Sequence, residues 1–92
     1  MTYQIVRTRR FMRGVKRLHP NTAAAIHAAI AAIAENPKLG KEKKSDLEFF
    51  FVYKYQILDV QYLLAYLIDE GTKEIVLMAV GPHENFYRDL KR

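Results

Sequence analysis

The sequence predicts an α+β domain in which a hairpin of two helices packs on a four-stranded, mainly antiparallel, twisted sheet. Its 92 residues are enough for one domain, residues 1–92, with one hydrophobic core. Apolar residues recur at helical spacing between residues 8 and 35, after a short strand at residues 3–7. Three runs rich in β-branched and aromatic residues follow, separated by short turn signals. The predicted order is therefore β-α-α-β-β-β-α, ending in a short C-terminal helix.

The first helix is predicted to run from an N-cap at Thr8 to Leu18. Phe11, Val15 and Leu18 lie at i, i+4 and i+7, which places them on one buried stripe. Gly14 weakens this helix in isolation, so packing against the rest of the domain must hold it.

A second helix is predicted at residues 22–35, with Asn21 as its cap. Asn36 and Pro37 end it, because the residue before a proline avoids the helical conformation. His27 is offset from the apolar stripe of this helix, so we expect it on the surface. The stripe consists of Ile26, Ile30 and Ile33.

The connector at residues 38–46 is basic and shows no periodicity, so it is predicted to be a loop. The next strand is predicted at residues 48–57, and its side chains alternate between two faces. One face carries Phe49, Phe51, Tyr53 and Tyr55, and the other carries Phe50, Val52, Lys54 and Gln56. Hairpin turns lead into strands at residues 60–68 and 75–80, and the last of these is apolar on both faces.

The C-terminal segment is the best candidate for a chemical site. We expect the last strand to stop at Gly81-Pro82 and a helix to follow, folded back over the sheet face that the helix hairpin leaves uncovered. If Pro82 begins this helix, His83 lies in its first turn, where the helix dipole favours a neutral imidazole. Lys54 joins the site only if its side of the strand is that face. At 100° per residue, the inward arc of roughly 100° holds His83, Phe86, Tyr87 and Leu90.

Composition excludes several classes of protein. The chain has no cysteine, which rules out disulfides and thiolate metal sites. Its longest apolar stretch, residues 23–34, is interrupted by His27 and is too short to span a bilayer. The N-terminus has no signal-peptide core. We therefore expect a soluble, cytoplasmic protein that binds no membrane.

Positive charge is concentrated in the first half of the chain. Residues 1–44 hold ten Lys and Arg against two Glu, a balance of +8, whereas residues 45–92 hold five against eight acidic residues, a balance of −3. This asymmetry predicts binding to RNA, DNA or an acidic protein, although exposed cations also solubilise helices. The cations of the first helix are Arg9, Arg10, Arg13, Lys16 and Arg17, and those of the connector are Lys41, Lys43 and Lys44.

The whole chain resembles the RelE/ParE superfamily of toxins from type II toxin–antitoxin systems. The resemblance is carried by FMRGVKRL, NPKLGKEKKSDL, VYKY, YLLAYLID and, most specifically, VGPHENFYRDLKR. It implies a toxin that is neutralised by a cognate antitoxin. Many members of the superfamily cut messenger RNA in the ribosomal A site, while another branch inhibits DNA gyrase. For a ribosome-directed member, the cations of the first helix and the connector are the expected contacts to RNA and the ribosome.

A ribonuclease of this kind needs a base for the ribose 2′-OH, a cation for the phosphate and an acid for the leaving oxygen. His83 is the expected acid or base, because imidazole ordinarily titrates near neutrality. Lys54 or Arg88 is expected to stabilise the phosphate, and Tyr87 to stack on a base or hold the ribose. The reaction requires no metal or other cofactor, and the sequence contains no cluster of metal ligands.

The chain departs from the nuclease pattern in its sheet. A strand arginine that is common in RelE-like nucleases is replaced here by Tyr62, Leu63 or Leu67, depending on the alignment. Gln56 stands where a second basic residue often follows Lys54. His83 stands where an arginine often lies, which is closer to the histidine-bearing RelE, YafQ and YoeB-like mRNA interferases.

Three functions follow from these features. His83 beside Tyr87 favours a ribosome-dependent, metal-independent mRNA endonuclease that inhibits translation. The missing strand arginine favours a gyrase inhibitor that acts by binding alone. The basic first half would also suit a non-toxic nucleic-acid-binding relative.

Overall fold

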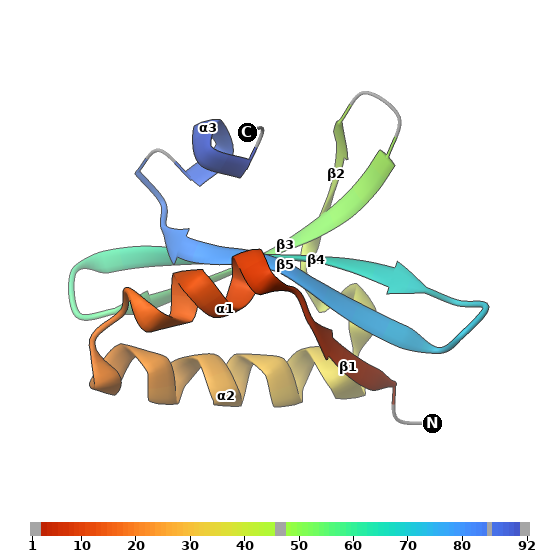
Figure 1. Ribbon diagram of the computed structural model, residues 1–92, viewed down its shortest axis with the longest axis horizontal. Coiled ribbons are helices and arrows are strands. Elements are labelled where there is room, and N and C mark those ends of the chain that lie inside the picture. Colours follow the sequence, from red (N-terminus) through yellow and green to blue (C-terminus); the bar gives the residue numbers. More distant parts are fainter. Residues whose placement is uncertain (1–2, 46–47, 85, 91–92) are drawn as a thin grey trace.

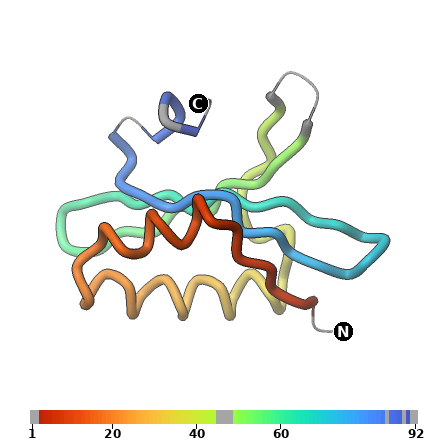
Figure 2. Tube along the Cα trace, in the orientation of Figure 1, coloured from red at the N-terminus to blue at the C-terminus, as the bar shows by residue number. Residues whose placement is uncertain are grey.

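The computed structural model describes residues 3–45, 48–84 and 86–90, and within them the chain forms one five-stranded sheet with helices on both sides (Figures 1 and 2). No helix among these residues is long and apolar enough to cross a membrane. The elements are β1 (Gln4–Arg7), α1 (Arg9–Lys16), α2 (Pro20–Glu35), the 3₁₀ helix η1 (Pro37–Leu39), β2 (Lys41–Ser45), β3 (Glu48–Ile57), β4 (Val60–Asp69), β5 (Glu74–Pro82) and α3 (Phe86–Leu90).

The strand order is β1-β5-β4-β3-β2. β1 runs parallel to β5, and the other three pairs are antiparallel. Helices α1 and α2 cover one face of the sheet, and α3 lies on the other side (Figure 1). The predicted α+β arrangement, with a helix hairpin on a mainly antiparallel sheet, is therefore confirmed.

The prediction of a loop at residues 38–46 is wrong for residues 41–45, which form a strand; residue 46 lies outside the described residues. This additional strand gives the sheet five strands instead of the predicted four. Residues 41–45 form β2, which pairs with the first half of β3. An edge strand is held by backbone hydrogen bonds to one neighbour, and its side chains can remain in water. Four of the five residues of β2, whose sequence is KEKKS, can therefore be charged. Lysines on an edge strand also discourage pairing with other molecules.

Helix boundaries differ slightly from the prediction. Thr8 caps α1 as expected, because its Oγ1 accepts a hydrogen bond from the Phe11 N–H at 3.2 Å. α1 ends at Lys16, two residues before the predicted end. α2 begins at Pro20 with His19 as its N-cap instead of Asn21, since proline suits the first turn of a helix.

The main core lies between the helix hairpin and the sheet. Four of the six predicted stripe residues, Phe11, Ile26, Ile30 and Ile33, are buried there. The other two, Val15 and Leu18, are partly buried and pack against the same cluster. The predicted packing is confirmed, and His27 is exposed as expected.

Gly14 allows α1 to lie directly against β5. A Cβ atom at this position would stand 2.6 Å from the carbonyl oxygen of Val80, a backbone atom that cannot easily move. Helix propensity alone favours alanine over glycine by about 1 kcal/mol. The close contact must therefore outweigh the local preference of the chain.

We expect Gly14→Ala to lower the free energy of unfolding by about 1–3 kcal/mol, because it overpacks the contact between α1 and β5. Urea denaturation followed by circular dichroism measures this change. The exposed residue Met12, on the same helix, provides the control, because Met12→Ala adds no atom to the contact. A Gly14→Ala protein more stable than the wild type would contradict the close packing.

Tyr66 anchors the segment that leads from α2 into β2. Its buried hydroxyl donates a hydrogen bond to the Pro37 carbonyl at 2.6 Å and accepts one from the Gly40 N–H at 2.9 Å. The ring stacks on Phe51 with centroids 5.5 Å apart. By contrast, the buried hydroxyl of Tyr55 has no hydrogen-bond partner within the described part of the chain.

These two tyrosines provide a matched pair of substitutions. Tyr66→Phe should cost about 1–3 kcal/mol of stability, because it leaves two backbone groups without their partner. Tyr55→Phe removes the same atom from the same layer and should be neutral or stabilising. Thermal unfolding of the two variants measures the contrast, and equal losses of stability would contradict the anchoring role of Tyr66.

Tyr55 and Tyr66 should also make the stability of the folded protein depend on pH in the alkaline range. Burial raises the pKa of Tyr55 and also that of Tyr66. Unfolded tyrosine loses its proton near pH 10, while the folded protein retains it, so stability should fall as the pH rises above about 10. Tyr55→Phe should reduce this alkaline loss in a titration of the melting temperature.

Candidate functional site

The face of the sheet opposite α1 and α2, here called the α3 face, carries a second apolar cluster with polar residues beyond it. α3 and the β2–β3 hairpin both rise on this side of the sheet (Figure 1). The buried members of the cluster are Phe50, Val52, Leu63, Ala65, Ala79 and Phe86. The members of this cluster are buried, so the side chains available for chemistry are the polar ones that lie further along the same strands.

Lys54 lies on the α3 face. It follows Phe50 and Val52 at a spacing of two along β3, which puts all three on one side of the strand. Lys54 pairs with Leu63 of β4, and Leu63 pairs in turn with Gly81 of β5. The lysine side chain is exposed.

His83 lies on the same face, next to the end of β5. Its N–H donates a hydrogen bond to the Gln61 carbonyl at 2.8 Å, which continues the β4–β5 pairing one residue beyond Pro82. The imidazole is exposed. Two inter-strand spacings, or about 10 Å, separate β3 from β5, so Lys54 and His83 border one patch of the face.

A β-bulge in β5 puts His83 on this face. Ala65 pairs with Ala79 and Tyr66 pairs with Leu77, so Met78 has no partner on β4. Before the bulge Leu77 packs into the helix-side core, and after it Val80 does, so the alternation has shifted by one residue. Without the bulge, His83 would lie on the side of the helix hairpin.

The prediction that Pro82 begins the last helix is wrong. Pro82 is the last residue of β5, and α3 begins at Phe86. Proline is tolerated here because β1 pairs with β5 only as far as Leu77, so the edge of β5 that faces away from β4 has no strand partner at Pro82 within the described residues. His83 therefore precedes the helix, and the expected effect of a helix dipole on its imidazole does not apply.

Helix α3 brings Tyr87 to the α3 face. Phe86 is buried against the sheet, and the Tyr87 ring meets it edge-on at 88° with centroids 5.5 Å apart. The half-buried Tyr87 ring lies 6.0 Å from the Nζ atom of Lys43 on β2. Arg88 is exposed on the same helix.

The strand character of β2 separates the three connector lysines. Lys41 pairs with Val52 and Lys43 with Phe50, so both lie on the α3 face. Lys44 pairs with Phe49 on the opposite face, with its Nζ atom 5.8 Å from that ring. The three lysines were predicted to act together. The alternation of side chains along a strand separates them, since it puts Lys41 and Lys43 on one face and Lys44 on the other.

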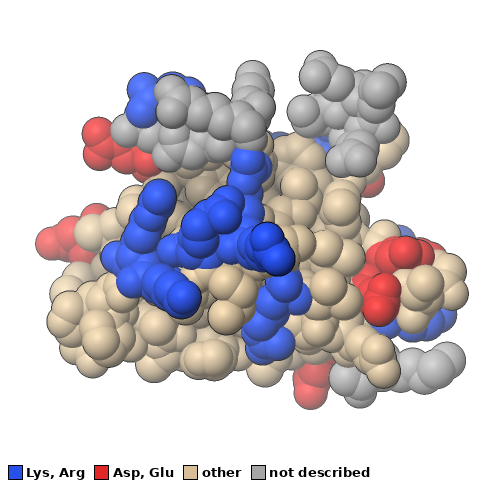
Figure 3. All heavy atoms as spheres, viewed as in Figure 1, with Lys and Arg blue, Asp and Glu red and all other residues tan. Residues whose placement is uncertain are grey.

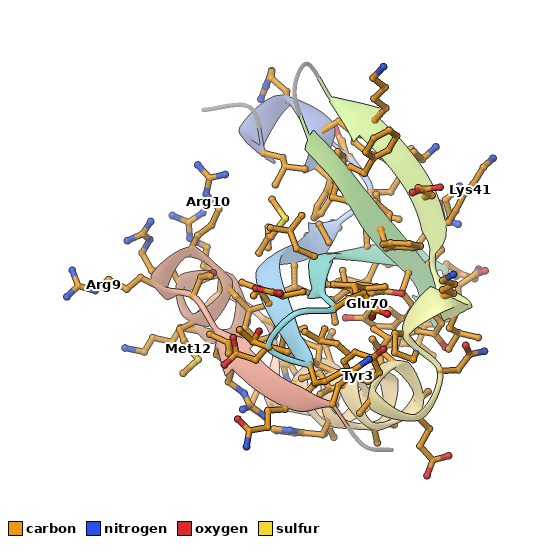
Figure 4. The ribbon with its side chains drawn as sticks, turned by 90° about the vertical axis from the view of Figure 1, so that its right-hand side faces the viewer. Tyr3, Arg9, Arg10, Met12, Lys41 and Glu70 are labelled. Carbon is orange, nitrogen blue, oxygen red and sulfur yellow. The ribbon has the colours of Figure 1, made fainter. Side chains whose placement is uncertain are left out.

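The cations of α1 form a separate surface. They cover α1 as a continuous positive band (Figure 3), and Arg9 and Arg10 lie on the opposite side of the molecule from Lys41 (Figure 4). Arg10 also supports α3, since its Nη1 donates a hydrogen bond to the Leu90 carbonyl at 2.8 Å. The structure therefore separates Arg9 and Arg10 from Lys41 of β2 (Figure 4).

A groove lies between α1, the end of β5 and α3, and it has a volume of about 480 Å³. We call it the arginine groove. Among the residues that line it are Arg10 and Arg13 from α1, Arg17 directly after α1, Pro82 from β5, Glu84, and Phe86 and Leu90 from α3. Across residues 3–45, 48–84 and 86–90, no three His, Asp or Glu side chains are placed to hold a metal ion.

A family of known proteins matches almost the whole chain. The profile of the ParE-like toxin of type II bacterial toxin–antitoxin systems aligns with residues 5–91. The chain belongs to this family. No curated protein sequence matches this ParE-like toxin.

Solved structures share the fold of this ParE-like toxin. One is the toxin–antitoxin complex RelBE2 of Mycobacterium tuberculosis, with a TM-score of 0.78, 24% identity, 90% of this chain covered and 100% of that chain. A mutant of Escherichia coli toxin RelE in the free state has a TM-score of 0.78, 14% identity and coverage of 99% and 92%. The intact E. coli RelBE complex has a TM-score of 0.71, 15% identity and coverage of 86% and 94%.

The strand positions where RelE-like nucleases commonly carry arginine are apolar or aromatic in this ParE-like toxin. Leu63 is fully buried in the cluster on the α3 face, and Leu67 packs against the same cluster. Tyr62 stacks on Tyr55, whose ring belongs to the helix side of the sheet. None of these three positions on β4 supplies a cation to the α3 face.

Proposed function

We propose that this toxin is an endoribonuclease that cleaves messenger RNA at the ribosome and so inhibits translation. The observation that carries the proposal is that a histidine, two lysines and a tyrosine belong to the α3 face, with the Lys43 Nζ atom 6.0 Å from the Tyr87 ring. The histidine is His83, which directly follows β5, and the second lysine is Lys54 of β3.

These residues suit an attack of the ribose 2′-oxygen on the adjacent phosphorus, which breaks the bond to the 5′-oxygen. His83 is exposed and is proposed to accept the 2′ proton or to protonate the leaving oxygen. Lys54, Lys43 and Arg88 are proposed to offset the charge on the phosphorane-like transition state. Tyr87 is proposed to stack on a base or hold the ribose. No step of this reaction needs a metal or another cofactor.

The cations of the first half of the chain, Lys43 among them, are proposed to attract ribosomal RNA. Phosphate contacts provide affinity without sequence specificity, and they need only an accessible positive surface. The band on α1 provides such a surface (Figure 3), and the lysines of β2 add to it at the other edge of the sheet. The proposed contacts are Arg9, Arg10, Arg13, Lys16, Arg17, Lys41, Lys43 and Lys44.

A cognate antitoxin is the protein partner of a toxin of this family, and two of the structural relatives are solved as toxin–antitoxin complexes. We propose that the cognate antitoxin of this toxin carries an acidic segment that covers the basic surface, since opposite charge speeds association. We propose that the toxin acts in the cytoplasm, where a ribosomal target would be found.

Inhibition of DNA gyrase by binding is the second candidate. The buried side chain of Leu63 favours it, because it puts an apolar group on the α3 face beside Lys54, where a nuclease would benefit from a cation. A gyrase inhibitor needs a complementary surface and no proton transfer. A non-toxic nucleic-acid-binding relative would need only the basic surface.

Induction of the toxin without its antitoxin tests these functions in one experiment. Transcript integrity is followed by primer extension, and plasmid supercoiling is followed on the same samples. We expect cleaved transcripts, arrested growth and unchanged supercoiling. Relaxed plasmid with intact transcripts would favour gyrase inhibition, and normal growth with neither change would favour the non-toxic relative.

A further inference from the structure

We propose that the arginine groove binds the phosphate backbone of single-stranded RNA that extends beyond the cleaved bond. This inference rests on the proposed ribonuclease function and deepens it. It assigns the three groove arginines a role distinct from the diffuse attraction of the rest of the α1 band. In this proposal the groove is a second binding site, separate from the patch that contains His83 and Lys54.

The charge of the groove fits a polyanion. Arg10, Arg13 and Arg17 follow one another at about one helical turn, so they form a row along one wall. Arg13 and Arg17 are exposed, and Glu84 is the acidic residue among the groove lining. Guanidinium groups bind phosphate oxygens through two parallel hydrogen bonds, which makes such a row suited to successive phosphates.

The apolar lining of the groove points away from a protein ligand. Phe86, Val80 and Ala79 are only 6%, 7% and 9% exposed, because they already pack within the toxin. Protein partners gain most of their affinity by burying a few large side chains in open apolar pockets. Leu18, Leu90 and the exposed Pro82 add apolar surface, but none of them forms a deep apolar pocket beside the three arginines, so we infer a ligand that binds mainly through charge.

The position of the groove fits an RNA strand that also reaches the α3 face. Pro82 lines the groove, and the next residue, His83, lies on the α3 face. On the edge of β5 that faces away from β4, no strand among the described residues covers this end, because β1 pairs only as far as Leu77. A strand of RNA held at His83 can therefore pass around the end of β5 and into the groove.

Binding of short RNAs of two lengths to the full chain, free of antitoxin, tests the proposal. The probes are a dinucleotide, which occupies only the patch at His83, and a decamer. Both carry 2′-O-methyl groups, which prevent cleavage, and affinity is measured by fluorescence anisotropy at several salt concentrations. The groove variants are Arg13→Gln and Arg17→Gln. The matched controls are Arg7→Gln and Lys38→Gln, which each remove one exposed charge outside the groove.

We expect each groove variant to weaken binding of the decamer several-fold and to lower its salt slope by about 0.7, the loss of one single-strand phosphate contact. Binding of the dinucleotide should not change, and the control variants should bind both probes as the wild type does. Equal losses in the control variants, or no loss in the groove variants, would overturn the proposal. Unchanged RNA binding with weaker capture of an oligo-glutamate peptide would identify the groove as a protein-docking surface and also overturn it.

The outcome is separable from that of the proposed function. A toxin that cleaves no RNA, but whose groove variants lose affinity for the decamer, would retain the groove as an RNA-binding site without the nuclease. If the toxin cleaves RNA but its groove variants bind the decamer normally, the groove proposal is overturned and the nuclease proposal stands.

Discussion

Replacement of His83 by glutamine is expected to abolish growth arrest and to lower the rate of RNA cleavage by roughly 100- to 10,000-fold, the usual contribution of a general acid or base. Glutamine retains hydrogen bonding but cannot exchange a proton at neutral pH. The fold should be preserved, because the imidazole is exposed and the contact to Gln61 comes from the backbone N–H. Cleavage of a defined transcript on purified ribosomes measures the effect.

His27 provides the control for this experiment. It is exposed on α2, away from the α3 face, so His27→Gln should cleave RNA as the wild type does. Lys54→Ala and Tyr87→Phe should have smaller effects than His83→Gln, because neighbouring groups share positioning and charge stabilisation. A folded His83→Gln variant that still arrests growth, with intact messenger RNA and altered plasmid topology, would disprove the nuclease and favour gyrase inhibition.

Truncation of Ile33 to alanine is expected to lower the free energy of unfolding by about 2–5 kcal/mol. The Ile33 side chain is completely buried between α2 and the sheet, so the substitution leaves a cavity in the main core. A small domain has a total stability of about 5–15 kcal/mol, and the variant could therefore lose much of it. Urea denaturation at two temperatures measures the change.

Leu39→Ala is the matched control, since it also removes three carbon atoms. Leu39 lies in η1 and is 42% exposed, so its truncation should cost far less than that of Ile33. If the two variants lose equal stability, the helix hairpin does not provide the main core, and the packing described above is wrong.

Much of the fold can be predicted from the sequence, because periodicity is a local property of the chain. The spacing of Phe11, Val15 and Leu18 indicates the buried side of α1 without knowledge of its partner. The alternation in β3 likewise places Lys54 with Phe50 and Val52. The C-terminal signature also indicates the toxin superfamily. The family match supports this assignment, and the shared fold agrees with it.

β2 could not be predicted in the same way. Its five residues contain no apolar alternation, and its pairing depends on the backbone of β3 and on the anchor that Tyr66 provides at Gly40. β3 follows β2 closely in the chain, but Tyr66 is 26 residues from Gly40. The placement of Lys43 near Tyr87 follows from this pairing, so the sequence contained no direct indication of it.

The face on which His83 lies depends on a feature that the sequence does not encode in any visible pattern. Residues 75–80 are apolar throughout, so a shift of one residue in their alternation leaves the pattern unchanged. The bulge at Met78 makes that shift, so that Leu77 and Val80 both pack in the core below the helix hairpin, while Ala79 packs in the cluster on the α3 face. The residue types of the proposed site and their order were therefore readable from the sequence, whereas their placement on one face follows from the pairing of the strands in the folded sheet.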